Sequence, residues 1–448
     1  MNPQEYQTPP RWWPSRLSPF VIRHFTRRRN RALRRQGIRR IHVHGTEIVS
    51  DAIREGAGVL VVSNHSYHYD SFVLMEAGLR GNWHPQIMTA WQVFMMYRWF
   101  GRWSLQRHGC FSVNREGLDT KAFKQAMEIL THGRHPLTIY PEGDIYHSND
   151  KVMPFREGAA AIALMAARQN VRPIVMIPCA MKCFYCADPT QELHDMMGKL
   201  EAEFLWRPRA DLPLIDRIYR FGEGLLSLKE IEYLGHPRQG ELRDRIQFLA
   251  SAVLNQVRVR RGLPIAGHDL GEQIRHLRSQ IVKQINQLQE QTLGPRRIRG
   301  RKSRQNRRVN LAKSARNGTL LKSDRLHFNA ELQARQVDLR DLFFVTQLSS
   351  YHGDYALQKP SLERMAETID KYEEDIFSLA EPTPRGQREA YVRFGPAQVV
   401  SPHGPGAVEL TERWEHDVQR QLDEINRHHA GVGESDPEAV TAAVFAQP

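Results

Sequence analysis

Short apolar runs alternate with helix-like stretches from about residue 41 to residue 178. The runs are brief and rich in valine and isoleucine, which predicts strands buried in a sheet. The predicted strands cover 41–44, 59–63, 111–114, 136–140 and 174–178, and the predicted helices begin at 70, 119 and 158. This alternation predicts an α/β fold with a mixed, largely parallel sheet that is flanked by helices and binds ligands at the carboxyl ends of its strands.

The texture of the chain changes after about residue 190. Long polar, helix-forming stretches at 241–261 and 270–291 predict an added helical region, and later residues 390–395 and 408–428 read as a strand and an amphipathic helix. We therefore expect five parts, namely a basic aromatic segment at 1–40, a catalytic core at 41–190, a mainly helical insertion at 191–387, a return to the core at 388–430 and a loose tail at 431–448.

Charge favours an anionic partner. The chain has 63 Lys and Arg against 50 Asp and Glu, which gives a net charge of +13. The basic run 296–316 contains no aromatic residue for stacking on bases, so specific nucleic-acid binding is disfavoured. That run is typical of a solvated loop or an anion-binding segment. A basic nucleic-acid-binding protein or a membrane scaffold without catalysis remains the alternative to an enzyme.

The segment 11–40 mixes aromatic and aliphatic residues with many arginines. Such a mixture suits the interface of an anionic membrane, whereas a basic tail or a docked helix would account for it equally well. No apolar stretch approaches the ~18 residues that span a bilayer, and the N-terminus lacks the apolar centre of a signal peptide. We expect a cytoplasmic protein that associates peripherally with the cytoplasmic face of a membrane.

Cysteine usage favours a reducing compartment, because four cysteines are too few for a disulfide framework in 448 residues. Three of them, Cys179, Cys183 and Cys186, have a spacing that could bind zinc together with His194. Their place directly after a predicted core strand favours ordinary packing instead.

The segment between the predicted strand 59–63 and the following helix holds His65 and Asp70. If the helix starts within this segment, the two side chains lie about one turn apart, and the carboxylate can fix one tautomer of the imidazole. Such a histidine is a general base that can take a proton from a hydroxyl, so the chain needs no serine or cysteine nucleophile. A histidine that merely satisfies its hydrogen bonds is the alternative for this pair alone.

Three further blocks follow in order, and each lies at a predicted strand. They are 109–115, which ends in Arg115; Pro141-Glu142-Gly143; and the strand 174–178, which ends in Pro178. Together with Asn64-His65-x4-Asp70, these blocks resemble the glycerolipid acyltransferase family, which includes glycerol-3-phosphate and lysophosphatidic acid acyltransferases. Segment 154–158 also matches the stretch that links the last two blocks.

The resemblance implies an O-acyltransferase of phospholipid biosynthesis or remodelling. It implies that His65 is the base, that Asp70 orients it, and that five residues contribute to substrate binding: Asn64, Arg115, Glu142, Gly143 and Pro178. The expected donor is acyl-CoA or acyl-carrier protein, the expected acceptor is a lipid hydroxyl, and no metal or organic cofactor is expected.

One departure from the family pattern concerns the third block. Many relatives that act on phosphate lipids continue it with threonine and arginine, whereas this chain has Asp144 and Ile145. Asp144 would repel a phosphate beside it, and either Arg115 or Arg156 could supply the missing positive charge.

Overall fold

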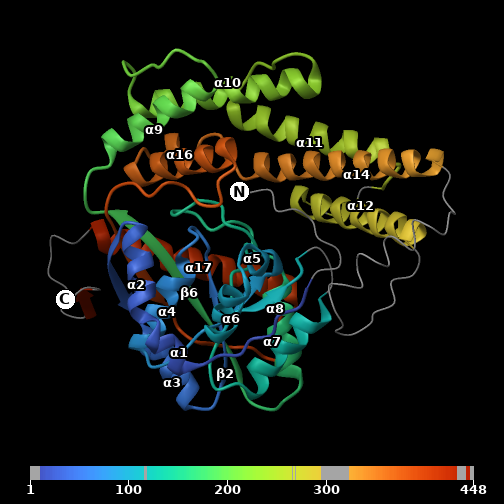
Figure 1. Cartoon of the computed structure of the whole chain (residues 1–448). Helices are drawn as coiled ribbons and strands as arrows, with labels where there is room; N and C mark the ends of the chain where they lie inside the picture. The colour runs from blue at the N-terminus through green and yellow to red at the C-terminus, as the bar shows by residue number, and fades with distance from the viewer. Residues whose placement is uncertain are drawn as a thin grey trace. The chain divides into compact units, whose positions relative to one another are not determined.

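The computed structural model describes residues 11–115, 119–264, 266–267, 269–293, 322–430 and 440–443. The chain divides into two compact units. The first combines residues 1–223 with 355–448, and the second comprises residues 224–354. Figure 1 shows the sheet in the first unit and the long helices of the second.

Nine strands of the described residues form one sheet in the first unit, in the order β4-β3-β5-β2-β6-β7-β1-β9, with β8 paired to β6. The pairs that involve β2, β3, β4 and β5, and the pair β1–β7, are parallel. The pairs β6–β7, β6–β8 and β1–β9 are antiparallel. The predicted mixed, largely parallel α/β sheet is confirmed. The strands are β1 Ile38–His44, β2 Gly58–Ser63, β3 Gln86–Ala90, β4 Phe111–Val113, β5 Leu137–Ile139, β6 Ile174–Tyr185, β7 Arg388–Phe394, β8 Gln398–Val399 and β9 Val440–Ala443.

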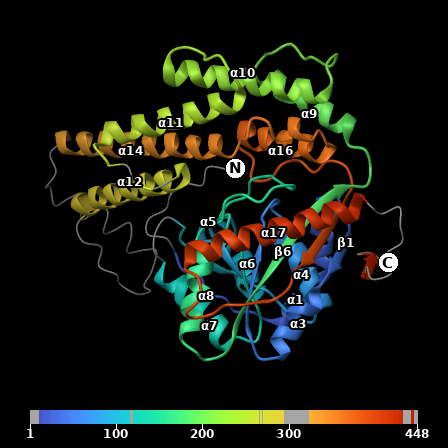
Figure 2. The same cartoon turned by 180° about the vertical axis from the view of Figure 1, so that it is seen from behind.

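Helices cover both faces of this sheet. As a result, β2 is buried on both sides. Val59 and Val61 belong to one apolar core, whereas Leu60 and Val62 belong to the other. The first core lies under α3 (Thr46–Arg54) and α4 (Asp70–Arg80). The second lies under α7 (Thr120–His132), α8 (Gly158–Arg168) and α17 (Ala407–Ala430), and Figure 2 shows α17 running across the strands.

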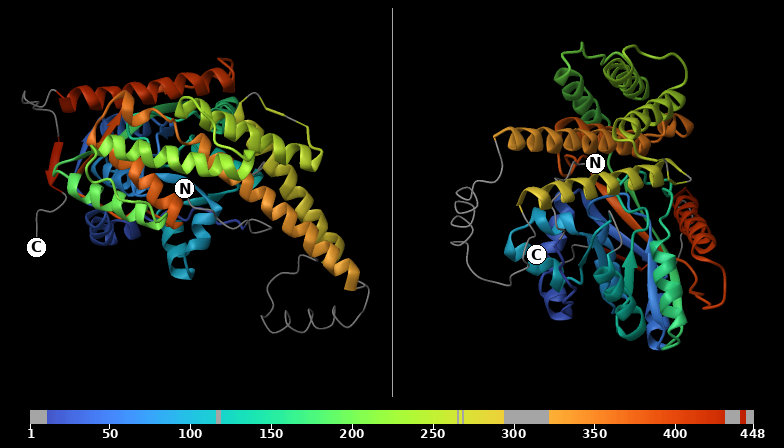
Figure 3. Two further views of the ribbon diagram at one scale, coloured as in Figure 1. Left: turned by 90° about the horizontal axis from the view of Figure 1, so that it is seen from above. Right: turned by 90° about the vertical axis from the view of Figure 1, so that its right-hand side faces the viewer.

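The other helices of the first unit are α1 Pro19–His24, α2 Thr26–Arg35, α5 Trp91–Met96, α6 Trp99–Arg107, α9 Thr190–Glu203, α15 Tyr355–Gln358 and α16 Leu362–Phe377. The helix α10 (Leu214–Leu234) crosses the boundary between the units. The second unit contains α11 Leu242–Arg261, α12 Leu270–Leu293 and α14 Lys322–Ser349, which lie side by side (Figure 3) and bury Val253, Ile281 and Leu342. None of the described helices is both long enough and apolar enough to cross a bilayer.

The strand predicted at 174–178 is longer than expected. It does not end at Pro178, because β6 continues to Tyr185. Pro178 lacks an N–H, which usually excludes proline from a central strand. Here its C=O accepts from the Gly395 N–H at 2.8 Å, so its missing N–H points to the same side of the strand. On that side the partner of β6 changes from β8 to β7, so no ladder bond is lost.

Several other parts of the sequence prediction need correction. The elements β3, α5 and α6 between residues 86 and 107 were not predicted. Trp13 stacks on Phe94 at 5.2 Å and Trp12 meets Phe111 edge-on, so these two partly buried tryptophans pack against the core. The basic run 296–316 lies outside the described residues, as does the expected tail apart from 440–443, which form β9.

Candidate active site

The site lies where β2 and β5 end, at the carboxyl edge of the parallel strands. His65 Nδ1 is 3.1 Å from Asp70 Oδ2. The same oxygen accepts from the backbone N–H groups of Ser66 and Tyr67, at 2.7 and 2.8 Å. Because three donors converge on one buried carboxylate oxygen, Asp70 is fixed in place and fixes the imidazole in turn.

The route to this geometry differs from the predicted one. The helix α4 begins at Asp70 itself, so His65 and Asp70 are not joined by a helical turn. Instead the loop 64–69 folds back over the first residue of the helix. Asp70 is 3% exposed, whereas the His65 side chain is 19% exposed and can be reached from solvent.

Two contacts from the loop after β5 position His65. The Tyr140 ring stacks on the imidazole, with 4.3 Å between centroids and 21° between planes. The His65 N–H donates to Glu142 Oε1 at 2.9 Å. Burial and the nearby Asp70 carboxylate raise the pKa of Glu142 well above its usual range, although the bond from His65 opposes the shift. Glu142 therefore contacts the backbone of the candidate base.

Asn64 is fully buried and joins the end of β2 to β6. Its side-chain amide donates to the Met181 C=O at 2.9 Å and accepts from the Met181 N–H at 2.8 Å. The same amide donates to Ser66 Oγ at 3.1 Å. These bonds fix the point at which the loop leaves the sheet, and they use the side chain inside the protein.

Gly143, Arg115 and Asp144 form a charged group beside this loop. Gly143 has a φ of +75°, which favours glycine, and an added Cβ would lie 2.5 Å from the Arg156 guanidinium. Arg115 donates to the Gly143 C=O and lies 3.6 Å from Asp144 Oδ2. Burial alone would raise the pKa of Asp144, but the guanidinium groups of Arg115 and Arg156 hold it below its usual range.

This arrangement changes the electrostatic argument drawn from the sequence. Asp144 does not stand alone, because two arginines surround it and leave the group with a local charge of +1. The structure thus brings Arg115, Gly143 and Asp144 together near the loop of His65. Pro178 is buried in the middle of β6, opposite Val62 of β2.

The sequence analysis missed the contribution of α16. Glu367 of this helix accepts from Tyr67 Oη at 3.2 Å and from the Asn149 N–H at 3.1 Å. One carboxylate therefore holds the loop after β2 and the loop after β5 together. No local pattern could reveal this, since Tyr67 and Glu367 are 300 residues apart in the chain.

The cysteine cluster does not assemble. Cys179 and Cys183 are buried inside β6, whereas Cys186 is exposed. Burial raises the pKa of both buried thiols to about 12, so neither offers a ready thiolate. His194 lies 3.3 Å from Arg217 Nη1. The packing interpretation of these cysteines is the one that fits the structure.

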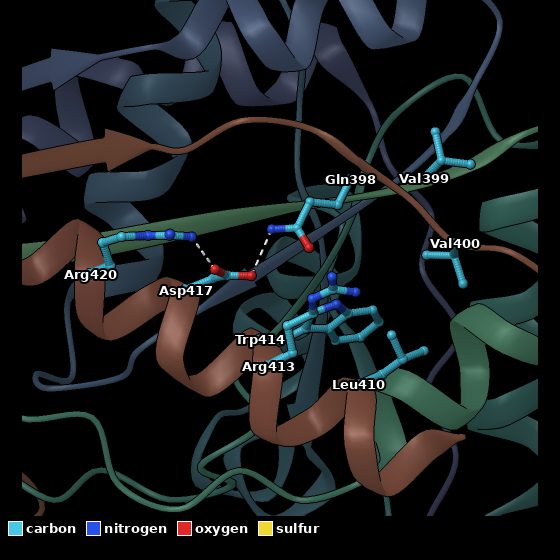
Figure 4. A pocket seen from close by; sticks show the side chains of 8 residues that line it. All are labelled: Gln398, Val399, Val400, Leu410, Arg413, Trp414, Asp417 and Arg420. Carbon is cyan, nitrogen blue, oxygen red and sulfur yellow. Dashed lines mark hydrogen bonds and ion pairs between the residues drawn. The ribbon is translucent and has the colours of Figure 1, made fainter. Parts of the chain in front are cut away.

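A cavity of about 440 Å³ lies away from this site, between β8 and α17. Figure 4 shows its lining, in which Gln398 and Arg420 both contact Asp417. Residues of β8 pair with Val175 and Met176 near the start of β6. The cavity is therefore at the other end of the parallel strands from His65, where α/β folds do not usually bind substrates.

The family model described as "Acyltransferase" matches residues 40–182. This range covers most of β1, all of β2 to β5 and most of β6, and it includes His65, Asp70, Arg115, Glu142 and Pro178. No curated protein matches the chain.

Proposed function

Residues 40–182 belong to the acyltransferase family, and on that premise we propose that the protein moves a fatty acyl group from a thioester to a hydroxyl of a glycerolipid-type acceptor. The donor is acyl-CoA or acyl-carrier protein, and the acceptor is a lysophospholipid or glycerol 3-phosphate. The observation that supports this proposal best is the bond of 3.1 Å between His65 and a buried, fixed Asp70.

His65 acts as the general base in this proposal. Its Nδ1–H donates to Asp70, which leaves the lone pair on Nε2 for the proton of the acceptor hydroxyl. The hydroxyl oxygen attacks the thioester carbonyl and forms a C–O bond, and the tetrahedral intermediate then breaks its C–S bond. The leaving thiolate takes the proton from His65, so the products are an ester and a free thiol. Asp70 stabilises the imidazolium during this cycle.

The backbone N–H groups of the loop before α4 already have partners within the protein. The N–H groups of Ser66 and Tyr67 donate to Asp70, and that of His65 donates to Glu142. Since these donors serve to hold the catalytic pair, the oxyanion requires other groups.

Arg115 and Arg156 are the proposed contacts for an anionic acceptor. Together with Asp144 they leave one net positive charge, which suits a phosphate or phosphodiester headgroup. Because Arg115 already has two protein partners, the gain from a phosphate contact is smaller than for an unengaged arginine.

The test is an assay with a radiolabelled acyl thioester against glycerol 3-phosphate, lysophosphatidic acid, lysophosphatidylcholine and an amino-lipid. If Arg115 binds the headgroup, Arg115→Ala should raise the KM for phosphate monoesters by about three- to tenfold and leave the KM for the donor unchanged. Strong preference for phosphate monoesters in both proteins would contradict the role of Arg115. Transfer to none of the lipid acceptors would contradict the proposed function.

A membrane surface is the proposed partner. Phe20 and Trp99 are 76% and 77% exposed. Phe25 of the N-terminal helices lies 6.4 Å from Phe100, and the Arg28 guanidinium lies 5.7 Å from the same ring. Exposed aromatic rings among arginines suit lipid headgroups. Exchange of Phe20 and Trp99 for serine should weaken binding to anionic vesicles, whereas Val399→Ser, at an exposed site on β8, should not.

A further inference from the structure

Three side chains from distant parts of the first unit meet beside the candidate active site. His68 lies in the loop after β2, His147 in the loop after β5, and Glu374 on α16. Their ligand atoms all lie within 4.8 Å of one another. Glu374 Oε1 is 2.7 Å from His68 Nε2 and 3.0 Å from His147 Nε2.

This cluster has the features of a site for a cation. Both imidazoles converge on the same carboxylate oxygen, in a region where His147 and Glu374 are each 1% exposed. His147 has a φ of +50°, an uncommon and strained conformation for a residue with a side chain. In this conformation the Nε2 of His147 lies against Glu374 and near the ligand atom of His68. A shared cation gives the two nitrogens and the oxygen a common partner.

We propose that His68, His147 and Glu374 bind a Zn²⁺ ion. Two imidazole nitrogens and one carboxylate oxygen are a familiar ligand set for zinc, whereas Mg²⁺ and Ca²⁺ prefer oxygen ligands alone. Bonds of about 2.0–2.1 Å in tetrahedral geometry separate neighbouring ligands by about 3.3 Å. The observed 2.7 and 3.0 Å therefore require only small shifts of the side chains.

Access and outer contacts define the site further. The His68 side chain is 27% exposed, so a water molecule can reach a fourth coordination position. Among the residues that the structure describes, the buried Nδ1 of His147 has no hydrogen-bond partner. Metal-bound histidines usually donate this N–H, and loss of such a contact costs about ten- to a hundredfold in affinity. We therefore expect weaker binding than at a zinc site with complete outer contacts.

The ion has a positioning role. His68 is three residues after His65, and His147 is five residues after Glu142, so the ion ties both loops of the candidate active site to α16. Glu367 makes a second connection of the same kind about two turns earlier on the same face of α16. The ion takes no part in proton transfer, and the inference does not depend on the proposed reaction. It departs from the expectation, drawn from the resemblance, that the protein holds no metal.

The experiment measures metal binding by the full-length protein. Protein stripped with a chelator is titrated with ZnSO₄ by calorimetry, and bound zinc is counted by atomic emission after gel filtration. We expect one equivalent in the wild type, at least a tenfold loss of affinity in His68→Asn and Glu374→Gln, and no comparable binding of Mg²⁺. Zn²⁺ should also raise the thermal midpoint of the wild type but not of His68→Asn.

Two control variants separate this site from other zinc ligands. His42→Asn removes a His–Glu pair of similar geometry, in which His42 Nε2 lies 2.8 Å from Glu389 Oε2 and no second histidine of the described residues completes a three-ligand group. Cys186→Ser removes the one exposed thiol among the four cysteines. Both should keep the full equivalent. Equal zinc binding by all four variants, or none by the wild type, would overturn the proposal. Acyl transfer by zinc-free protein would leave the proposed function intact, so the two proposals fail separately.

Discussion

The two ends of the parallel strands hold histidines in opposite environments. At the carboxyl end, His65 has Asp70 as a partner, and His68 and His147 share Glu374. At the amino end, His84 precedes β3 and His135 precedes β5, and their rings lie 5.2 Å apart. The Nδ1 atoms of this second pair are buried without a hydrogen-bond partner in the described part of the chain.

The partner, more than the residue type, decides what each histidine can do. Burial, His135 and the arginines Arg23 and Arg29 lower the pKa of His84 to about 4. Such an imidazole stays neutral and packs as an aromatic ring. A carboxylate that accepts from one ring nitrogen instead fixes the tautomer and stabilises the protonated form. Of these two groups of histidines, the one at the carboxyl end is therefore equipped for proton transfer.

The contrast between the two ends of the strands predicts the largest loss of acyl transfer when the candidate base, His65, is replaced. His65→Ala should reduce acyl transfer by at least about 100-fold, since it removes the group that takes the proton. The thermal midpoint should stay nearly unchanged, because His65 is partly exposed and its loop is also held by Asn64 and Asp70. Steady-state kinetics and thermal melts of the purified variant provide the measurement.

His84→Phe is the matched control for that experiment. It removes a histidine from the other end of the same strands and should keep transfer within about twofold of the wild type. Substantial activity in His65→Ala would contradict the mechanism. A loss of folded protein would instead assign His65 a structural role.

A smaller effect is expected for the partner of the base. In Asp70→Asn the side-chain oxygen can still accept from Ser66 and Tyr67, but the negative charge beside the imidazole is lost. We expect kcat to fall by about tenfold or more, though less than in His65→Ala, with little change in KM. Equal effects on kcat and on the thermal midpoint would indicate that Asp70 acts mainly by holding the loop.

Much of the carboxyl end could be predicted because its information is local. Apolar runs predicted β2, β5 and the first half of β6, and the helix start predicted at residue 70 is that of α4. What brings His65 and Asp70 together is a loop that folds back over Asp70, and not the helical turn considered in the sequence analysis. The continuation of β6 past Pro178 could not be predicted from the local sequence. The residue that donates a hydrogen bond to Pro178, Gly395, lies over 200 residues away in the chain.

Contacts that depend on distant segments could not be predicted in the same way. Glu367 and Glu374 look like ordinary charged positions on a polar helix, yet both are about 1% exposed and contact the loops after β2 and β5. The amino-end pair was also unpredictable. His65 is marked in the sequence by Asp70 five residues later, whereas no local pattern at His84 predicts that its ring meets His135, which is 51 residues away and is brought there by the fold.

The smallest expected effect is on the stability of the folded protein at acidic pH. It tests the histidine pair at the amino end of the strands alone. The pKa of His84 is about 4 in the folded protein, below its ordinary value of 6.5, so the unfolded chain binds a proton first as the pH falls. Stability from this residue is therefore present above pH 6.5 and is lost progressively between pH 6.5 and about 4. At pH 5 the loss is about 1 kcal/mol after allowance for partial access of water.

His84→Phe keeps an aromatic ring beside His135 but cannot be protonated, so its urea midpoint should fall less than that of the wild type between pH 7.5 and pH 5. The exposed His403→Gln controls for removal of a histidine from the surface. Equal acid sensitivity in wild type and His84→Phe would mean that His84 is not held neutral by its surroundings, and the contrast between the two ends of the sheet would then rest on the carboxyl end alone.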